Sequence, residues 1–342
     1  MRAIVVGPVA AWSVADVWRG WCRGLVEAGA TVLPFKLTDR YLYYESAVLL
    51  DDDAKVVKSM DRHEAMTAAT RHILAAAYEF CPDVVFVIHG ASIDPHELRK
   101  LRCPIVVVMT ECPYEDQMQT AWCQAVEPTL ILLNDPTHQG VYGQIAPAFY
   151  VPHAYDPTVH HPGPSVDNHD CVFVGTGFPN RFDWLSRVDW TGIGLALAGD
   201  WTRLDGTDLA RFVLHADDLG ECVSNDRAAE LYRGARTGFN VYRRTADGEH
   251  STPDAWAIGP REVEMAACGL WFARQSGPES DEVLSMLPAV STPEELGDVI
   301  RWGLTHRQQA EDAAAAAFRA VADRTFAHHA RRTLCRLEAI TH

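Results

Sequence analysis

The feature of this sequence that most restricts its fold is a repeated alternation of short apolar runs with helical patterns. The runs are continuous, without polar residues at every second position, and are typical of strands covered on both faces of a parallel sheet. Those of the first half cover residues 3–6, 31–35, 84–88, 105–109, 130–133 and 148–151, and those of the second half cover 171–174, 195–198, 238–242 and 270–273. The sequence therefore predicts two successive α/β domains, each with a doubly wound parallel sheet.

Prolines and glycines mark the boundary between the two domains. They interrupt all periodicity over residues 153–168, which contain Pro157, Pro162, Gly163 and Pro164. The length of 342 residues also suits two domains of roughly 150 residues each. We expect an N-terminal domain over residues 1–160 and a C-terminal domain over residues 165–318, followed by a helical tail.

Charge and cysteine usage narrow the class of protein. The formal net charge of -16 argues against broad binding to nucleic acid, which requires a basic face. The 9 cysteines are scattered without a CxxC pair, which is typical of reduced thiols in the cytoplasm. No apolar run reaches the roughly 18 residues of a membrane span, and no spacing of His, Cys or acidic residues is typical of a metal site. We expect a soluble cytoplasmic protein without a metal ion.

Each predicted domain contains a strand that ends in a glycine turn. Gly7 follows the first strand, and Gly175, Thr176 and Gly177 follow the run at 171–174. Glycine lets backbone N–H groups approach an anionic ligand, and the Arg181 side chain, a few residues further along, can neutralise a diphosphate. Because neither turn is a full GxGxxG pattern, a tight strand-to-helix turn with a surface arginine is an equally good interpretation.

A second group of candidate residues lies on a short helix predicted between Pro260 and Gly269. Arg261 and Glu264 are three residues apart and share one face of that helix. An arginine at a helix start suits a phosphate, and a carboxylate one turn later suits paired ribose hydroxyls. The alternative, favoured on spacing alone, is that the acidic residues only complement the helix dipole.

In the N-terminal domain, ionisable residues follow the ends of four predicted strands, namely His89, Glu111, Asp135 and His153. The carboxyl ends of parallel strands meet at one edge of the sheet, where ligands of open α/β sheets bind. This set therefore predicts an acceptor site with a general base. Each residue taken singly is more simply explained as the cap of a loop.

The chain resembles GT-B glycosyltransferases, specifically the CgeB-like group with a glycosyltransferase group 1-like C-terminal domain. The likeness covers nearly all of residues 165–340. It is carried by FVGTG at 173–177 with Arg181 after it, LAGDW at 197–201, AELYR at 229–233 after Ser224, GFNV at 238–241, PREVEMAACG at 260–269 and PEEL at 293–296. The first half resembles the family more loosely, through CPDVV at 81–85 and VPHAYDP at 151–157.

The resemblance implies a fold and a reaction. It implies two Rossmann-like domains facing across a cleft, with a C-terminal helix at about 320–342 returning to the first domain. The reaction is the transfer of a hexosyl or related sugar from a nucleoside diphosphate sugar, without a metal or another cofactor. The acceptor stays open among a polysaccharide, a natural product, a protein and a modified DNA base, and so does the oligomeric state.

The resemblance also implies roles for particular residues. Donor binding falls to Gly175, Thr176, Gly177, Arg181, Trp201, Asn240, Tyr242, Arg261 and Glu264, of which Glu264 would hold the ribose. Gly7, Asp135 and His153 would lie on the acceptor side. Arg181 and Arg261 would stabilise the leaving diphosphate, and His89 or Glu111 would serve as the base. The chain departs from the two-glutamate motif of retaining members, because Trp256 stands eight residues before Glu264.

Two other functions share the same fold. A nucleotide-sugar epimerase and a non-catalytic nucleotide-sugar-binding protein would show the same alternation of strands and helices. Release of free sugar or its epimer without an acceptor would indicate the epimerase. Donor binding without any turnover would indicate the binding protein.

Overall fold

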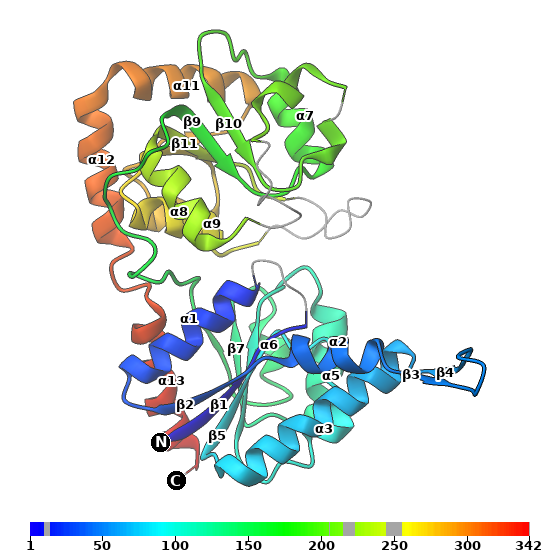
Figure 1. Ribbon diagram of the computed structural model, residues 1–342. Helices are drawn as coiled ribbons and strands as arrows, with labels where there is room; N and C mark the ends of the chain where they lie inside the picture. The colour runs from blue at the N-terminus through cyan, green and yellow to red at the C-terminus, as the bar shows by residue number, and fades with distance from the viewer. Residues whose placement is uncertain (10–13, 205, 215–222, 244–254, 342) are drawn as a thin grey trace. The chain divides into compact units, whose positions relative to one another are not determined.

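The structure is a computed structural model that describes residues 1–9, 14–204, 206–214, 223–243 and 255–341. The chain divides into two compact units. Unit 1 consists of Met1–Val151 and Phe326–His342, and unit 2 of Pro152–Thr325. Each unit contains its own parallel sheet (Figure 1). The stretch expected to link the two domains, residues 153–168, belongs to unit 2.

The sheet of unit 1 is built from fully buried apolar strands. All neighbouring strands are parallel, and β5, β6 and β7 are buried along their whole length, which explains their continuous apolar sequences. The strand order reverses direction between β1 and β5. The order across the sheet is β2 (Thr31–Phe35), β1 (Arg2–Val6), β5 (Val84–Ile88), β6 (Ile105–Met109), β7 (Leu130–Leu133) and β8 (Ala148–Tyr150).

Helices cover both faces of this sheet. One face packs against α1 (Val14–Glu27) and the C-terminal helix α13 (Phe326–Thr341), which lie side by side in Figure 1. The Trp21 ring of α1 contacts Phe86 of β5 and Phe326 of α13, with centroids 5.7 and 6.4 Å away. The return of the last helix to the first unit is therefore confirmed. The other face is covered by α2 (Leu37–Glu45), α3 (Arg62–Phe80), α4 (Pro95–Leu98) and α5 (Asp116–Val126).

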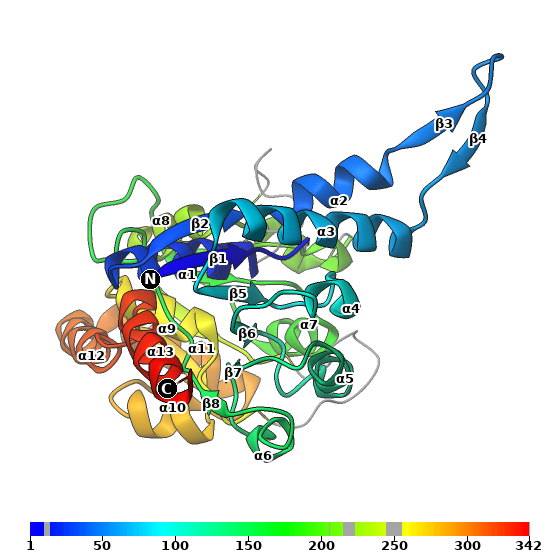
Figure 2. The ribbon, with the colours of Figure 1, turned by 90° about the horizontal axis from the view of Figure 1, so that it is seen from below.

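A hairpin that the sequence did not indicate lies between α2 and α3. Its strands β3 (Val48–Leu50) and β4 (Val56–Ser59) are antiparallel and pair with each other. Figure 2 shows the hairpin extending away from the two helices. Residues 51–53, three aspartates, form its turn, where the Asp51 carboxylate accepts bonds from the amides of Asp53 and Lys55 at 3.0 and 2.9 Å.

Unit 2 repeats the same architecture. All strand pairs of its sheet are parallel, and the strand order reverses between β9 and β11. A capping box begins α11 (Pro293–Thr305), since Thr292 and Glu295 bond each other's backbone amides. The order across the sheet is β10 (Leu195–Ala198), β9 (His169–Val174), β11 (Ala235–Asn240), β12 (Phe272–Gln275) and β13 (Ala289–Val290).

Two helical layers cover the sheet of unit 2. On one face lie α8 (Asn225–Gly234), α9 (Pro260–Ala267) and α12 (Arg307–Ala320). On the other lie α7 (Pro179–Arg187) and α11. In both units, then, a doubly wound parallel sheet is covered on both faces, which confirms the predicted fold class. The reversal of strand order in each sheet places a ligand crevice beyond the carboxyl ends of the strands on either side of it.

Candidate functional site

In unit 2, the strand β9 borders the reversal of strand order. The turn after β9 packs tightly against the turn after β10, the neighbouring strand on its other side. The amide of Gly175 donates to the carbonyl of Ala198 at 2.9 Å, and that of Gly177 donates to Asp200 at 2.7 Å. Gly199 has a φ of +117°, and a Cβ atom there would lie 2.5 Å from the Gly175 oxygen. The amides of Gly175 and Gly177 are thus bonded within the protein, and Gly199 is required for the close approach of the turns.

Arg181 lies at the start of α7 and joins the turn after β9 to the end of β11. Its Nε donates to the carbonyl of Val241 at 2.8 Å, and its Nη1 donates to that of Thr176 at 2.9 Å. The guanidinium also lies over the Phe173 ring, 5.1 Å from the centroid. Two nitrogens of this half-buried side chain therefore bond the backbone and hold the turn against the end of the strand.

Trp201, expected among the donor-binding residues, lies beneath the same turn. Its side chain is buried, and a Cβ atom on Gly177 would be 2.6 Å from its ring. The indole N–H donates to the carbonyl of Ala198 at 3.3 Å, and the ring contacts Phe173 edge-on. The structure therefore places Trp201 in the hydrophobic core that supports the turn.

A buried carboxylate that the sequence did not single out organises the end of β11. Glu262, in the first turn of α9, is fully buried. Its two oxygens accept bonds from the side chains of Asn240 at 2.7 Å and Ser280 at 2.6 Å. Burial raises the pKa of Glu262, and burial beside this carboxylate also raises the pKa of Tyr242 well above its usual value. The only sequence signal was an acidic residue at a helix start, which the helix dipole explained equally well.

Arg261 and Glu264 form an ion pair on another side of α9. The Nη1 of Arg261 lies 2.7 Å from the Oε2 of Glu264, and the two side chains are only 18% and 7% exposed. Next to this pair lies the buried ring of His160, whose pKa is lowered by desolvation. Both ring nitrogens of His160 lack a hydrogen-bond partner in the described part of the chain. Such atoms are rare in folded proteins and mark places where a polar ligand or water binds.

Arg181 and Arg261 lie on helices that cover opposite faces of the sheet. Arg181 comes from α7 and bonds Val241, whereas Arg261 comes from α9 on the other face. The start of α9 adjoins the same strand end, because a Cβ atom on Gly259 would lie 3.2 Å from the Tyr242 ring. Arg181 thus lies at the carboxyl end of β11 and the helix that carries Arg261 begins beside it, while the Arg261 side chain pairs with Glu264.

The segment that leads into α9 is fixed by a second buried acid. Glu279 accepts a bond from the amide of Ile258 at 2.7 Å, and its own amide donates to the carbonyl of Trp256 at 3.2 Å. Its other carboxylate oxygen accepts from the Nη2 of Arg324 at 2.7 Å. The loop containing Trp256, where the two-glutamate motif would place a carboxylate, is thereby held at its backbone.

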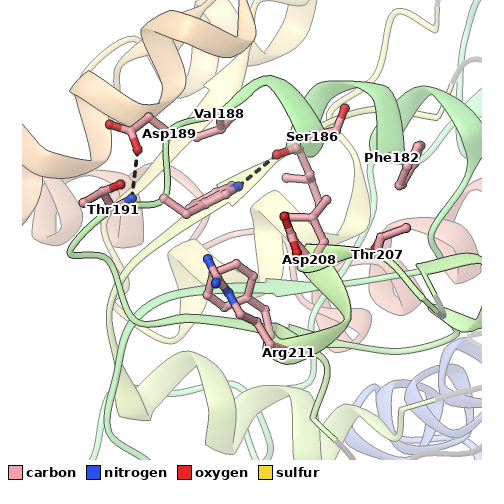
Figure 3. Close-up of a pocket in the computed structure, with 12 residues that line it drawn as sticks. Phe182, Ser186, Val188, Asp189, Thr191, Thr207, Asp208 and Arg211 are labelled. Atoms are coloured by element: carbon pink, nitrogen blue, oxygen red, sulfur yellow. Dashed lines mark hydrogen bonds between the residues drawn. The ribbon is translucent and has the colours of Figure 1, made fainter.

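A cavity of about 380 Å³ lies away from this edge, beside α7. Figure 3 shows that Phe182 of α7 and the loop residues Asp189 and Thr191 line it, with Asp208 and Arg211 of the short 3-10 helix Asp208–Phe212. Its loop residues precede β10, so that part of the cavity lies at the amino ends of the strands. Ligands of open parallel sheets bind at the opposite ends.

In unit 1, the predicted residues occupy the ends of several strands. The amide of Gly7 donates to Phe35, and its Cα adjoins the Trp18 ring. The Nδ1 of His89 lies 2.9 Å from the Thr110 hydroxyl, and His89 has a φ of +70°. A left-handed backbone at a residue other than glycine is strained and often occurs at functional sites.

The remaining three predicted residues have more ordinary surroundings. The buried Asp135 carboxylate accepts a bond from the amide of Thr137 at 2.8 Å, as a loop cap would. The half-buried Glu111 begins a turn in which its carbonyl accepts from the amide of Tyr114 at 2.7 Å. His153, expected on the acceptor side of the first domain, belongs to unit 2.

Two further properties concern the described residues as a whole. None of the helices there combines the length and the apolar character that crossing a membrane requires. Within the same ranges, no group of three or more His, Cys, Asp and Glu side chains is placed to hold a metal ion.

Comparison with known proteins shows which fold the whole chain has and which family part of it matches. The profile of the glycosyl transferase-like family matches residues 181–335. No curated protein matches the chain by sequence. HepE of Anabaena, crystallised with UDP-glucose, superposes with a TM-score of 0.63 at 12% identity, over 99% of both chains. Sucrose-phosphate synthase of Thermosynechococcus elongatus gives 0.63 at 10% identity, over 99% of this chain and 98% of the other.

A third structure agrees with these two. AviGT4, a glycosyltransferase involved in avilamycin A biosynthesis, superposes with a TM-score of 0.61 at 15% identity, over 99% of this chain and 97% of that chain. At such low identity, the superpositions establish the fold alone. On these findings, the chain has the GT-B fold of these glycosyltransferases, and its residues 181–335 match the glycosyl transferase-like family.

Proposed function

We propose that this protein transfers a hexosyl or related sugar from a nucleoside diphosphate sugar, bound at the carboxyl edge of unit 2, to an acceptor hydroxyl. The observation that carries the proposal is the buried Arg261–Glu264 pair, which lies on the first helical turns after the switch point of a glycosyl transferase-like domain. Burying a charged pair costs desolvation free energy, and charged groups are retained in such places more often at functional sites than elsewhere.

The chemistry of this cluster suits a nucleotide. The Glu264 carboxylate can accept hydrogen bonds from both hydroxyls of a ribose, and Arg261 can pair with the diphosphate at the positive end of α9. The ring nitrogens of His160, which have no hydrogen-bond partner among the described residues, offer further polar contacts beside the pair. Among the structural neighbours, HepE was crystallised with UDP-glucose and with UDP, which favours a uridine donor.

The leaving diphosphate develops negative charge as the bond to the sugar breaks, and a nearby guanidinium stabilises that charge. Arg261 is the better placed of the two arginines, because Arg181 uses two of its nitrogens on backbone carbonyls. We assign Arg181, Asn240 and Tyr242 to the shape of the donor site, together with the glycine turn at 175–177, with Trp201 supporting that turn.

The acceptor would bind at the carboxyl edge of unit 1. Gly7 and Asp135 shape this edge, and His89 and Glu111 are candidate bases by position. The same proposal includes a cytoplasmic location. It also includes a reaction that needs neither a metal ion nor a cofactor other than the donor. Its acceptor class stays open among polysaccharide, natural product, protein and modified base.

Thermal denaturation with UDP-, GDP-, ADP- and dTDP-sugars tests the proposal. A bound donor raises the melting temperature by mass action, and we expect one nucleotide class to do so for the wild type. We expect Arg261→Ala and Glu264→Ala to lose the shift, whereas Arg187→Ala, which removes a surface pair with Glu294, keeps it. A folded wild-type sample whose melting temperature no nucleotide sugar changes would contradict the proposal.

A further inference from the structure

The hairpin β3–β4 of unit 1 exposes apolar side chains along its whole length. Every residue of both strands is exposed, and the apolar ones are 48–62% exposed, namely Val48, Leu49, Leu50, Val56 and Val57. The two strands pair only with each other within the described chain, and Figure 2 shows them extending away from α2 and α3. A two-stranded hairpin is marginally stable in water, because it buries too little apolar surface by itself. Its surface is therefore typical of an element that binds a second molecule.

The last turn of α2, which leads into the hairpin, adds two exposed apolar side chains. Leu42 and Tyr43 are both more than half exposed. At about 100 Å² for each exposed apolar side chain, the hairpin and the end of α2 together approach the roughly 800 Å² that each partner buries in a stable interface. Monomeric proteins rarely expose an apolar patch of more than a few hundred Å². The size of this surface thus suits a stable contact between proteins.

The two edges of the hairpin differ in how they are protected. Leu49 pairs with Lys58, whereas Leu50 pairs with Val56, so that Val57 on β4 has no cross-strand neighbour. A lysine and a bulge on an edge strand are devices that prevent pairing with a further strand. The strand β3 has neither, and its outer edge can therefore pair with another strand.

The tip of the hairpin and the surface beside its base have complementary charge. The tip is acidic, because residues 51–55 comprise three aspartates, an alanine and a lysine. Beside the base lies a surface hollow of about 240 Å³, lined by Tyr44 in the last turn of α2 and by Arg71 of α3. Arg71 is exposed and shares the Glu97 carboxylate with Lys100, at distances of 3.0 and 2.6 Å. Two cations thus share one acid there, and the guanidinium has N–H donors left for a second carboxylate.

We propose that this hairpin joins two copies of the chain about a two-fold axis, with β3 of one copy antiparallel to β3 of the other. The antiparallel order brings each acidic tip to the base of the other hairpin, where the hollow with Arg71 lies. It also packs the apolar side chains of the two hairpins beside one another across the joined strands. Because the matching tip and base belong to the same chain, the partner that they specify is a second copy. Such a contact is self-complementary and closes after two copies.

Sedimentation equilibrium of the whole chain tests this association. We expect the wild type to form a dimer at micromolar concentration. Leu49, the central residue of β3, lies close to the proposed axis, and Leu49→Lys should raise the dissociation constant by about 10²-fold or more, since burial of the leucine is lost in both copies. The matched control is Val166→Lys, which places the same charge at an almost fully exposed valine of unit 2 and should leave the dimer intact.

Charge at the tip is tested separately. Asp52→Lys should raise the dissociation constant by about tenfold, because it replaces an attraction at the rim of the contact by a repulsion. Rising salt concentration should weaken the wild-type dimer for the same reason, and should weaken the Asp52→Lys dimer less. Equal dissociation constants for the wild type and Asp52→Lys would overturn the proposed contact between tip and base.

Formation of a disulfide bond tests which strands meet. In Leu49→Cys, the two new thiols lie close to the axis, so oxidation with copper–phenanthroline should give a covalent dimer. Val57→Cys is the matched control, because Val57 is equally exposed but lies on the outer strand. Its copy would be three strand spacings or about 14 Å away, beyond the roughly 7 Å that a disulfide spans. The wild type shows the background from the exposed Cys81 and Cys335.

The remaining outcomes are independent of the proposed glycosyl transfer. A wild type that stays monomeric at its highest soluble concentration would overturn the second copy as the partner of the hairpin. A dimer that Leu49→Lys leaves as tight as the wild type would show that the copies meet at another surface. Equal cross-linking of Leu49→Cys and Val57→Cys would overturn the pairing of β3 with β3.

Discussion

The Nε of Arg181 donates to the carbonyl oxygen of Val241 at 2.8 Å, and this bond fixes the turn after β9 against the end of β11. Both segments border the reversal of strand order in unit 2. Arg181 therefore sets the distance between the turn after β9 and the end of β11.

We expect Arg181→Lys to lower the free energy of unfolding by about 1–3 kcal/mol, because an ammonium cannot reach both the Val241 and Thr176 carbonyls in the planar geometry of guanidinium. Urea denaturation measures the change. Arg187→Lys on the exposed face of the same helix is the control, with an expected change below about 0.5 kcal/mol. Equal effects of the two substitutions would show that the bonds of Arg181 contribute little.

A second prediction concerns Gly199, whose Cα adjoins the Gly175 carbonyl. We expect Gly199→Ala to lower the free energy of unfolding by about 3 kcal/mol or more, since the new methyl group adds a backbone clash to the strain of a positive φ. Gly192 also has a positive φ, of +74°, but a Cβ atom there would meet no other segment of the described chain within 4 Å. Gly192→Ala should therefore cost only about 1–2 kcal/mol. Similar melting temperatures for the two variants would contradict the close approach of the turns.

We expect substitutions of Arg261 and Glu264 to have non-additive effects on the free energy of unfolding. Each single change, Arg261→Met or Glu264→Leu, leaves a buried charge without its partner and should cost about 3–5 kcal/mol. The double variant should be more stable than either single variant, because both charges are gone, yet it should still fail to bind a nucleotide sugar. Denaturation and a donor titration on all four proteins measure the two effects. Recovery of donor binding in the double variant would show that the pair is structural only.

Glu262 predicts a dependence of stability on pH. Its folded-state pKa is raised above 4.5, so its contribution to stability is fully present below pH 4.5 and is lost as pH rises through the folded-state value. The neutral Glu262→Gln variant lacks this loss. We expect its stability relative to the wild type to increase with pH, by about 1.4 kcal/mol for each unit by which the pKa is raised. A difference between the proteins that stays constant from pH 4 to 8 would contradict a raised pKa.

Much of the fold could be predicted from the sequence, because buried parallel strands have continuous apolar sequences wherever they occur. The runs at 31–35, 84–88, 105–109 and 130–133 coincide with β2, β5, β6 and β7. The hairpin β3–β4 was missed because its apolar residues are exposed and flank a polar turn. Burial is what gives a strand its sequence signature, and this hairpin lacks it.

The site residues could be predicted only in part. The pairing of Arg261 with Glu264 on one face of a helix could be predicted, because their spacing is a local property. The bonds of Glu262 could not, because its partners Asn240 and Ser280 lie on other elements.

The sequence by itself determined the class of each element and the two doubly wound sheets, because periodicity and burial are encoded in consecutive residues. Only the tertiary structure decided which side chains face one another: that Arg181 bonds the end of β11, that Trp201 lies under a turn, and that Glu262 bonds Asn240 and Ser280. Those contacts depend on strand order and on loops that meet across a sheet edge, and such long-range pairings leave no mark on the local sequence.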